Sequence, residues 1–247
     1  MAATSDEPVA DLDDDRGETR TGSAWDPGPR QYSVNRFNSV VLDVDSTLSD
    51  VEGIDWLAAL RGPEMEAWSA ELTARAMAGG MPIEAVYGER MRAVKPTRSE
   101  ILALATVYID RVAPRARETL AELRKNDVEL VMVSGGLREA ILPLAEEIGI
   151  RKERVHAVSV FFDKKGGYAG FEENSLFTQQ TGKRSAVSKM DLKGPVLALG
   201  DGMTDCEMKT VVNSFAAFTG FMRREPVVAR ADYVIENFDQ LRNLVLE

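Results

Sequence analysis

Two aspartates one residue apart follow an apolar run near the start of the chain. The stretch "SVVLDVDSTLSDVEGID" runs from Ser39 to Asp55 and places Asp43 and Asp45 where apolar residues give way to polar ones. In an extended chain, residues i and i+2 project from the same side, with their stems about 6–7 Å apart. That spacing would allow one carboxylate to attack a phosphorus atom and the other to serve the leaving oxygen. Taken alone, the pattern is more often a turn or a helix cap.

A hydroxyl and a lysine stand at two other points where predicted elements begin or end. Ser134 closes the apolar run "LVMVS" and is followed by Gly135 and Gly136, so its hydroxyl and the next amides could bind an anion at a helix N-terminus. Lys183, in "TGKRSAV", opens a predicted helix, where the helix dipole disfavours a cation unless an anion lies near. A plain turn and a solvated lysine are the alternatives.

The strongest of these patterns is "VLALGDGMTD". Asp201 and Asp205 flank Gly202 in the loop after an apolar strand, and carboxylate oxygens in such a loop suit Mg²⁺. A capping aspartate beside a glycine turn would read the same way. We favour the functional interpretation because three predicted strand ends carry polar groups of complementary kinds.

The elements that would position these residues alternate between strand and helix. Residues 39–44, 128–134 and 196–200 are predicted buried strands, and residues 52–112 are helical throughout. Residues 155–162 and 168–173 are predicted to pair as a hairpin. The fold class is therefore α/β, a Rossmann-like doubly wound parallel sheet with a helical cap inserted after the first strand.

We divide the chain accordingly into three parts, which are a disordered acidic tail (1–36), an αβ core (37–50 and 113–247) and a helical cap domain (51–112). The tail holds eight acidic residues and four arginines, so −4 of the net charge of −10 lies there. An acidic protein is a poor nonspecific ligand for nucleic acid or an anionic membrane. With a single cysteine and no predicted secretory signal, we expect a cytoplasmic protein that acts on a small molecule, as a monomer or homodimer.

Four segments in this order, "DVDST", "SGG", the lysine of "GKRSAV" and "GDGMTD", resemble the motifs of the haloacid dehalogenase (HAD) superfamily. The stretch "DVDSTLSDVEGID", the helical insertion and "YAGFEE" resemble, more narrowly, the phosphoserine phosphatases of that superfamily. The likeness extends from about Asn38 to the C-terminus. One departure is the loop "AFTGFMRRE", where the family often has a second glycine pair.

The resemblance implies that Asp43 is the nucleophile that forms an aspartyl-phosphate, and that Asp45 is the acid and base. It implies Mg²⁺ held by Asp43, the backbone carbonyl of Asp45, and Asp201, with Asp205 positioning the metal shell.

By the same likeness, Ser134, Lys183 and the amide of Gly135 bind the phosphate. Glu52 would meet the substrate ammonium and Arg90 the substrate carboxylate. From the residues alone, these last two would be ordinary helix surface residues.

The expected function is Mg²⁺-dependent hydrolysis of phosphoserine to serine and phosphate, the last step of serine biosynthesis. A phosphotransferase, or a phosphatase of another small phosphorylated amine or alcohol, would share the aspartyl-phosphate. A phospho-accepting signalling module is a third interpretation, disfavoured because Asp45 would activate water and shorten the life of the intermediate. A catalytically inactive binding protein is a fourth, disfavoured because every chemical role is filled.

Overall fold

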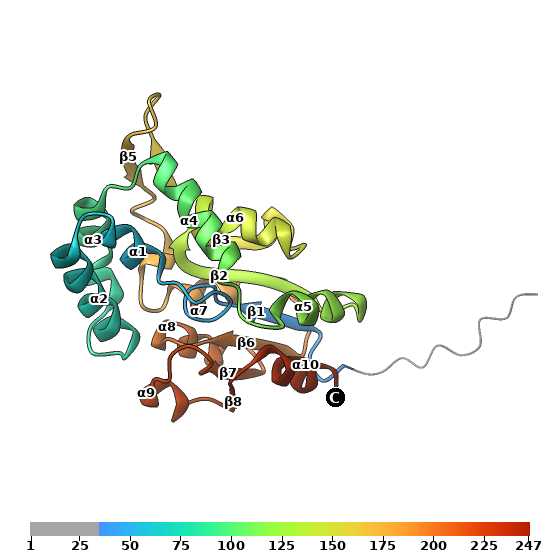
Figure 1. The fold of residues 1–247 in the computed structure, drawn as a ribbon. Coiled ribbons are helices and arrows are strands. Elements are labelled where there is room, and N and C mark those ends of the chain that lie inside the picture. The colour runs from blue at the N-terminus through green and yellow to red at the C-terminus, as the bar shows by residue number, and fades with distance from the viewer. Residues whose placement is uncertain (1–34) are drawn as a thin grey trace, which may run out of the picture. The chain divides into compact units, whose positions relative to one another are not determined.

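A six-stranded sheet forms the centre of the protein in the computed structural model, which describes residues 35–247 (Figure 1). All six strands are parallel, in the order β3-β2-β1-β6-β7-β8. Their bounds are β1 Ser39–Leu42, β2 Glu129–Leu137, β3 Val155–Val158, β6 Val196–Gly200, β7 Ser214–Phe218 and β8 Tyr233–Ile235.

The strand order reverses direction at β1, which lies between β2 and β6. Val40 of β1 is in register with Leu130 on one side and Leu197 on the other. In doubly wound sheets, ligands bind outside the carboxyl ends of the strands at such a reversal. Asp43 after β1, Asp201 after β6 and Ser134 among the last residues of β2 therefore meet at one edge of the sheet.

Alternate residues of the strands pack on opposite faces of the sheet. Val40 and Leu42 belong to one core cluster, which includes residues of α5, α6 and α10, whereas Val41 belongs to a second cluster with residues of α7, α8 and α9. Because helices cover both faces, the strands are apolar on both sides. This arrangement confirms the predicted α/β class. The helices are α5 Ala116–Lys125, α6 Arg138–Glu147, α7 Gly182–Val187, α8 Met203–Cys206, α9 Glu225–Val228 and α10 Phe238–Leu246.

The segment between β1 and α5 is helical, as predicted from the sequence. It contains α1 Gly53–Ala59, α2 Pro63–Met77, a 3₁₀ turn at Ile83–Ala85, α3 Tyr87–Val94 and α4 Arg98–Asp110. Pro63 begins α2, where its missing N–H costs nothing. Thr97 and Glu100 cap the start of α4 reciprocally in a capping box. In Figure 1, α1, α2 and α3 stand together at the left of the molecule, while α4 packs against α6.

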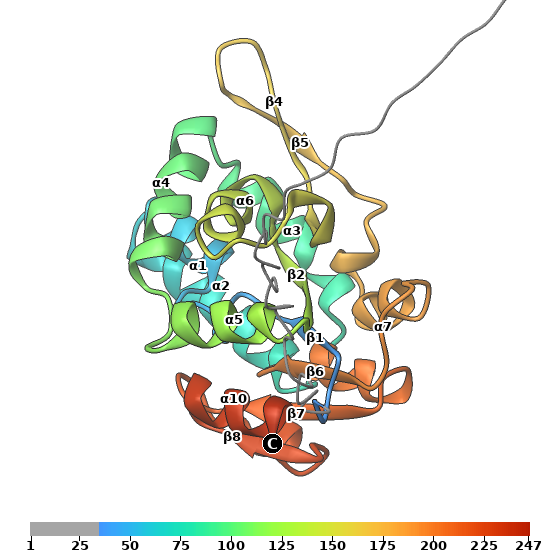
Figure 2. The same cartoon turned by 90° about the vertical axis from the view of Figure 1, so that its right-hand side faces the viewer.

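The predicted hairpin differs from the observed one. Its first half, β3, joins the main sheet beside β2, and only β4 (Val160–Phe162) pairs in antiparallel fashion with β5 (Tyr168–Phe171). Residues 155–158 are apolar enough for either partner, so the sequence pattern did not show where the strand divides. Figure 2 shows β4 and β5 projecting from the body of the protein.

The prediction of a disordered tail lies outside the described residues up to residue 34. Asn35 and Arg36, which the predicted tail also included, donate hydrogen bonds to the Asn126 carbonyl and the Tyr233 hydroxyl. Within residues 35–247, no helix combines the length and the apolar character that a membrane span requires.

Candidate active site

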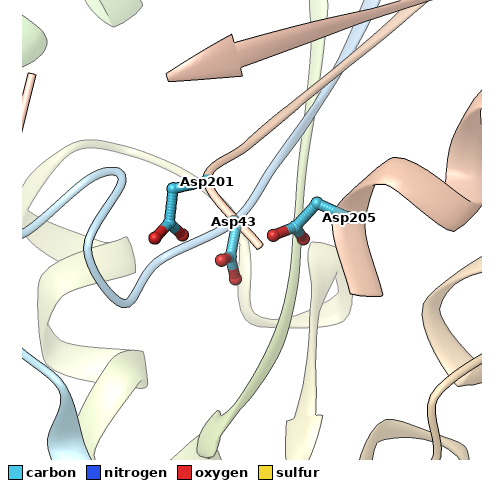
Figure 3. A group of neighbouring side chains, drawn as sticks. All are labelled: Asp43, Asp201 and Asp205. Carbon is cyan, nitrogen blue, oxygen red and sulfur yellow. The ribbon is translucent and has the colours of Figure 1, made fainter. Parts of the chain in front are cut away.

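Three carboxylates converge at the edge of the sheet (Figure 3). Asp43 directly follows β1, and Asp201 and Asp205 come from the loop and helix that follow β6. One carboxylate oxygen of each lies within 4.8 Å of one oxygen of the others, and all three side chains are buried. We call these residues, together with Lys183, the sheet-edge cluster.

Lys183 is the cation inside this cluster. From the first turn of α7, its Nζ donates to Asp43 Oδ1 at 2.7 Å and to Asp205 Oδ1 at 2.6 Å. Burial alone would lower the pKa of Lys183, but the two carboxylates outweigh burial and raise it. The lysine therefore stays charged at a helix start because anions face it, as the sequence pattern suggested.

The sheet-edge cluster fits a hard divalent cation. Lys183 pairs with two of its three buried carboxylates and Arg224 contacts the third, Asp201, so the carboxylates still outnumber the cations that face them. Burial, followed by the charge of Asp43, raises the pKa of Asp205, which means that the carboxylates repel one another when ionised. Closely set carboxylate oxygens are the donors that Mg²⁺ prefers, and an ion bound there would relieve this repulsion. Asp43, Asp201 and Asp205 could hold such an ion.

Asp45 lies apart from the cluster and has its own partners. Its Oδ1 accepts hydrogen bonds from the Tyr108 hydroxyl at 2.5 Å and from the Gly53 amide at 3.0 Å. Burial, followed by the charge of Glu52, raises the pKa of Asp45 to about 8 against the lowering effect of Tyr108. A carboxyl group with that pKa can give a proton and take one back near neutral pH, which is what an acid and base must do.

The predicted anion site differs in its backbone, because β2 does not end at Ser134 but continues through Gly135 and Gly136 to Leu137, where α6 follows. Gly135 lines the pocket, while Ser134 is buried beside it and accepts a hydrogen bond from the Gly136 amide at 2.9 Å. A Cβ at Gly136 would lie 2.7 Å from Asp45 Oδ2, so only a glycine lets this carboxylate approach the strand end.

A second group of polar side chains lies within the inserted helices. Arg90 on α3 is buried; its Nη2 donates to Asp55 Oδ1 at 2.5 Å and its Nε donates to Ser69 Oγ at 3.0 Å. Ser69 and Thr73 on α2 also donate to Asp55 Oδ1. We call Asp55, Ser69, Thr73 and Arg90 the insertion cluster. It holds the guanidinium in one orientation, with Arg90 lining the pocket.

Glu52, just before the inserted helices, is linked to the sheet-edge cluster through Arg224, a residue that the sequence analysis missed. It accepts a hydrogen bond from Ser46 Oγ at 2.8 Å, and burial raises its pKa. Arg224 Nη2 lies 3.5 Å from Glu52 Oε1, and Arg224 Nη1 contacts Asp201. Arg224 belongs to "AFTGFMRRE", the loop that departs from the family pattern, and that departure was the one available signal.

One pocket collects most of the predicted residues. Asp43, Asp45, Glu52, Arg90, Gly135, Lys183 and Asp201 line it, while Ser134 and Asp205 lie behind its wall. Sequence reasoning also missed apolar and aromatic lining residues, because helix-packing positions and pocket positions have the same periodicity; these are Ile54, Met77, Tyr87 and Phe177.

Comparison with known proteins agrees with this geometry. The family model of haloacid dehalogenase-like hydrolases matches residues 37–208. The chain is 35% identical over 210 residues to the chloroplastic phosphoserine phosphatase of Arabidopsis thaliana, covering 83% of this chain and 70% of that protein. It is 31% identical over 207 residues to the phosphoserine phosphatase of Homo sapiens, covering 83% and 91%.

Solved structures share the fold. A phosphoserine phosphohydrolase-like protein from Francisella tularensis superposes with a TM-score of 0.75 at 23% identity, over 84% of this chain and 99% of that one. A structure described as a phospho-aspartyl intermediate analogue of phosphoserine phosphatase gives 0.72 at 22% identity, over 84% and 98%.

The family match covers well over half of the chain, and the sheet has the α/β architecture that the four motifs implied. The protein therefore belongs to the haloacid dehalogenase-like hydrolases. Within that family, the relatives described above are phosphoserine phosphatases.

Proposed function

We propose that the protein is a Mg²⁺-dependent phosphoserine phosphatase that releases serine and phosphate. The observation that carries this proposal is a single pocket lined by Asp43, Lys183 and Asp45 at the sheet and by Arg90 from the insertion. The first three residues supply a nucleophile, a cation for the phosphate and an acid. The fourth supplies a guanidinium, whose planar fork matches a carboxylate such as that of phosphoserine.

The reaction uses Asp43 and Asp45 in two steps. An Asp43 carboxylate oxygen attacks the phosphorus, the bond from phosphorus to the serine oxygen breaks, and Asp45 gives its proton to that oxygen. Asp45 then takes a proton from water as the water attacks the aspartyl-phosphate, which releases phosphate and restores Asp43. Ser134, the Gly135 amide and Lys183 bind the phosphate oxygens throughout.

A bound Mg²⁺ would supply charge neutralisation between the carboxylates and the phosphate. Asp43, Asp201 and the backbone carbonyl of Asp45 would hold it, and Asp205 would position its surroundings. Lys183 lies between Asp43 and Asp205 and contacts one carboxylate oxygen of each. The protein itself therefore holds these two carboxylates in a fixed orientation.

We assign substrate selection to residues 51–112, acting as a cap over the site. Glu52 would accept the substrate ammonium and Arg90 would bind the substrate carboxylate. Support comes from the insertion cluster, which fixes Arg90 by two hydrogen bonds, to Asp55 and Ser69, before any substrate arrives. A group held in advance loses less entropy on binding.

The test is phosphate release from phosphoserine by the wild type and by Asp43→Asn, with Mg²⁺ present. We expect the substitution to lower turnover at least about a thousandfold, because no covalent intermediate can form, and to leave the fold intact by circular dichroism. Equal activity of the two proteins would reject Asp43 as the nucleophile.

The same assay distinguishes the related functions. Phosphoserine, phosphothreonine and phosphoethanolamine are compared, with and without homoserine as an alcohol acceptor. Preference for phosphoserine and release of inorganic phosphate are expected. Transfer of the phosphoryl group to homoserine would instead favour the phosphotransferase.

A further inference from the structure

Tyr108 contacts the acid and base from the far end of the helical insertion. It lies near the end of α4, is fully buried, and its hydroxyl donates to Asp45 Oδ1 at 2.5 Å. Its backbone carbonyl accepts a hydrogen bond from Ser49 Oγ at 3.0 Å. One residue of α4 is thus tied at two points to the loop that carries Asp45.

The two oxygens of Asp45 have different surroundings. Oδ1 accepts hydrogen bonds from both Tyr108 and the Gly53 amide. Oδ2 points toward the end of β2, since a Cβ placed on Gly136 would lie only 2.7 Å from it. With Oδ1 occupied by two donors, Oδ2 is the oxygen left to exchange a proton with a substrate in the pocket.

The chain leaves room for this contact at Gly53. A Cβ at that position would lie 2.2 Å from the Tyr108 hydroxyl oxygen. Any larger residue at Gly53 would displace the hydroxyl while keeping the amide that also serves Oδ1.

We propose that Tyr108 is a positioning residue for the phosphatase reaction: its hydroxyl fixes Oδ1 of Asp45 so that Oδ2 delivers the proton to the leaving oxygen. The inference rests on the proposed function, in that it takes Asp45 to be the acid and base. Because Tyr108 belongs to α4, the inserted helices then control proton transfer as well as substrate selection.

The test is Tyr108→Phe, assayed on two substrates that differ in their need for an acid. The serine oxygen of phosphoserine is a poor leaving group that requires protonation, whereas the nitrophenolate of p-nitrophenyl phosphate leaves without it. We expect kcat/KM to fall about tenfold or more for phosphoserine, because a misplaced acid loses part of its contribution. For p-nitrophenyl phosphate, we expect a fall of less than about threefold, since kcat/KM reports only steps up to leaving-group departure.

Two measurements exclude a merely structural role. Inhibition by the product serine reports binding, and its inhibition constant is expected to stay the same in Tyr108→Phe. Tyr233→Phe is the matched control, because it also removes a tyrosine hydroxyl that makes a hydrogen bond, to Arg36, away from the pocket. It should change neither substrate's kcat/KM. Equal losses on the two substrates, or no loss on either, would overturn the proposal.

Gly53→Ala tests the same contact independently and is decisive if Tyr108→Phe fails to fold. Like Tyr108→Phe, it should lower kcat/KM for phosphoserine much more than kcat/KM for p-nitrophenyl phosphate. If the wild type hydrolyses p-nitrophenyl phosphate but not phosphoserine, the proposed substrate is wrong. The positioning role is then tested with phosphoethanolamine in place of phosphoserine, since its alkoxide also requires an acid.

Discussion

The sheet-edge cluster and the insertion cluster line the same pocket, yet they handle charge in opposite ways. At the sheet edge, three buried carboxylates lie together and Lys183 pairs with two of them, Asp43 and Asp205. The pKa of Asp205 is raised because burial and its neighbour Asp43 disfavour its ionised form. In the insertion, Asp55 and Arg90 balance each other, and two hydroxyls complete the contacts of Asp55.

Under the proposed function, the sheet-edge cluster carries out the reaction and the insertion cluster selects the substrate. A cluster with excess negative charge has free energy to gain from a cation, and it changes when one binds. A neutral cluster with fixed hydrogen bonds gains little from a bound cation and keeps its geometry. The predictions that follow test whether this division holds.

The largest expected effect is the loss of activity on metal removal. Dialysis against a chelator should lower phosphate release at least about a hundredfold, because Lys183 alone then offsets the repulsion between Asp43 and the phosphate. Added Mg²⁺ should restore phosphate release. Asp201→Asn should raise the Mg²⁺ concentration needed for half-maximal activity about tenfold or more. Asp50→Asn, which changes an exposed acid of the loop after β1, is the control and should leave this concentration unchanged. Full activity in excess chelator would contradict the assignment.

A smaller and more selective effect is expected in the insertion cluster. Arg90→Lys loses the fork that reaches Asp55 and Ser69 together, so the orientation of the cation is no longer fixed. KM for phosphoserine should rise about tenfold, which corresponds to one charged hydrogen bond. The kcat/KM for phosphoethanolamine, which has no carboxylate, should change little.

Arg92→Ala provides the matched control for Arg90, because Arg92 lies on the same helix with its side chain 63% exposed. It should alter neither substrate's constants. If Arg90→Lys weakened both substrates equally, Arg90 would be a structural residue and the insertion would not select the carboxylate.

The sheet-edge residues could be predicted because their sequence context is local. Asp43 and Asp201 each follow a short apolar run, and parallel strands bring such ends together whatever the intervening sequence. Lys183 was noticed because its position at a helix start conflicts with the helix dipole.

The remaining site residues could not be predicted because their partners are distant or their positions look ordinary. Tyr108 lies 63 residues from Asp45 and has the spacing of a buried helix residue, which it also is. Arg224 contacts Asp201 only because a loop after β7 returns to the pocket. Residues 155–158 joined the main sheet rather than the hairpin because partner choice depends on which edge is free.

The pKa of Asp45 predicts how the stability of the metal-free protein depends on pH. The pKa is about 8 in the folded protein and 3.8 in the unfolded chain, so between these values the folded state binds the extra proton. The contribution of Asp45 to the free energy of unfolding should therefore fall as the pH rises from about 4 to 8. Asp45→Asn lacks this proton, so its stability relative to the wild type should increase over that range by roughly 1–4 kcal/mol.

Urea unfolding at pH 5 and pH 8 in the presence of a chelator measures this difference. A constant difference between the two proteins would mean that Asp45 is ionised already at pH 5. Burial and neighbouring carboxylates would then raise carboxyl pKa values in the sheet-edge cluster but not at Asp45.

The smallest effect concerns an ion pair that is more exposed than the insertion cluster. Arg61, just after α1, donates to both oxygens of Glu100 on α4, at 2.6 and 2.8 Å, and this contact lowers the pKa of Glu100 to about 2. Because the pKa of Glu100 is lower in the folded protein than its value of 4.5 in the unfolded chain, its ionisation stabilises the fold at pH values above 4.5. This stabilisation is lost as the pH falls toward the folded pKa of about 2. Because solvent screens the pair, Glu100→Gln should cost only about 0.5–1 kcal/mol at pH 7, and less at pH 3.

Glu100→Gln should also leave KM for phosphoserine unchanged, because the buried contacts of Arg90 do not depend on Glu100. Measuring KM together with the free energy of unfolding separates the role of the insertion cluster from that of the ion pair on the surface of the insertion. A rise in KM like that of Arg90→Lys would show that an exposed pair sets the geometry of the pocket. The distinction between a neutral insertion cluster of fixed geometry and a negatively charged sheet-edge cluster would then be wrong, since the geometry of the insertion would itself depend on salt and pH.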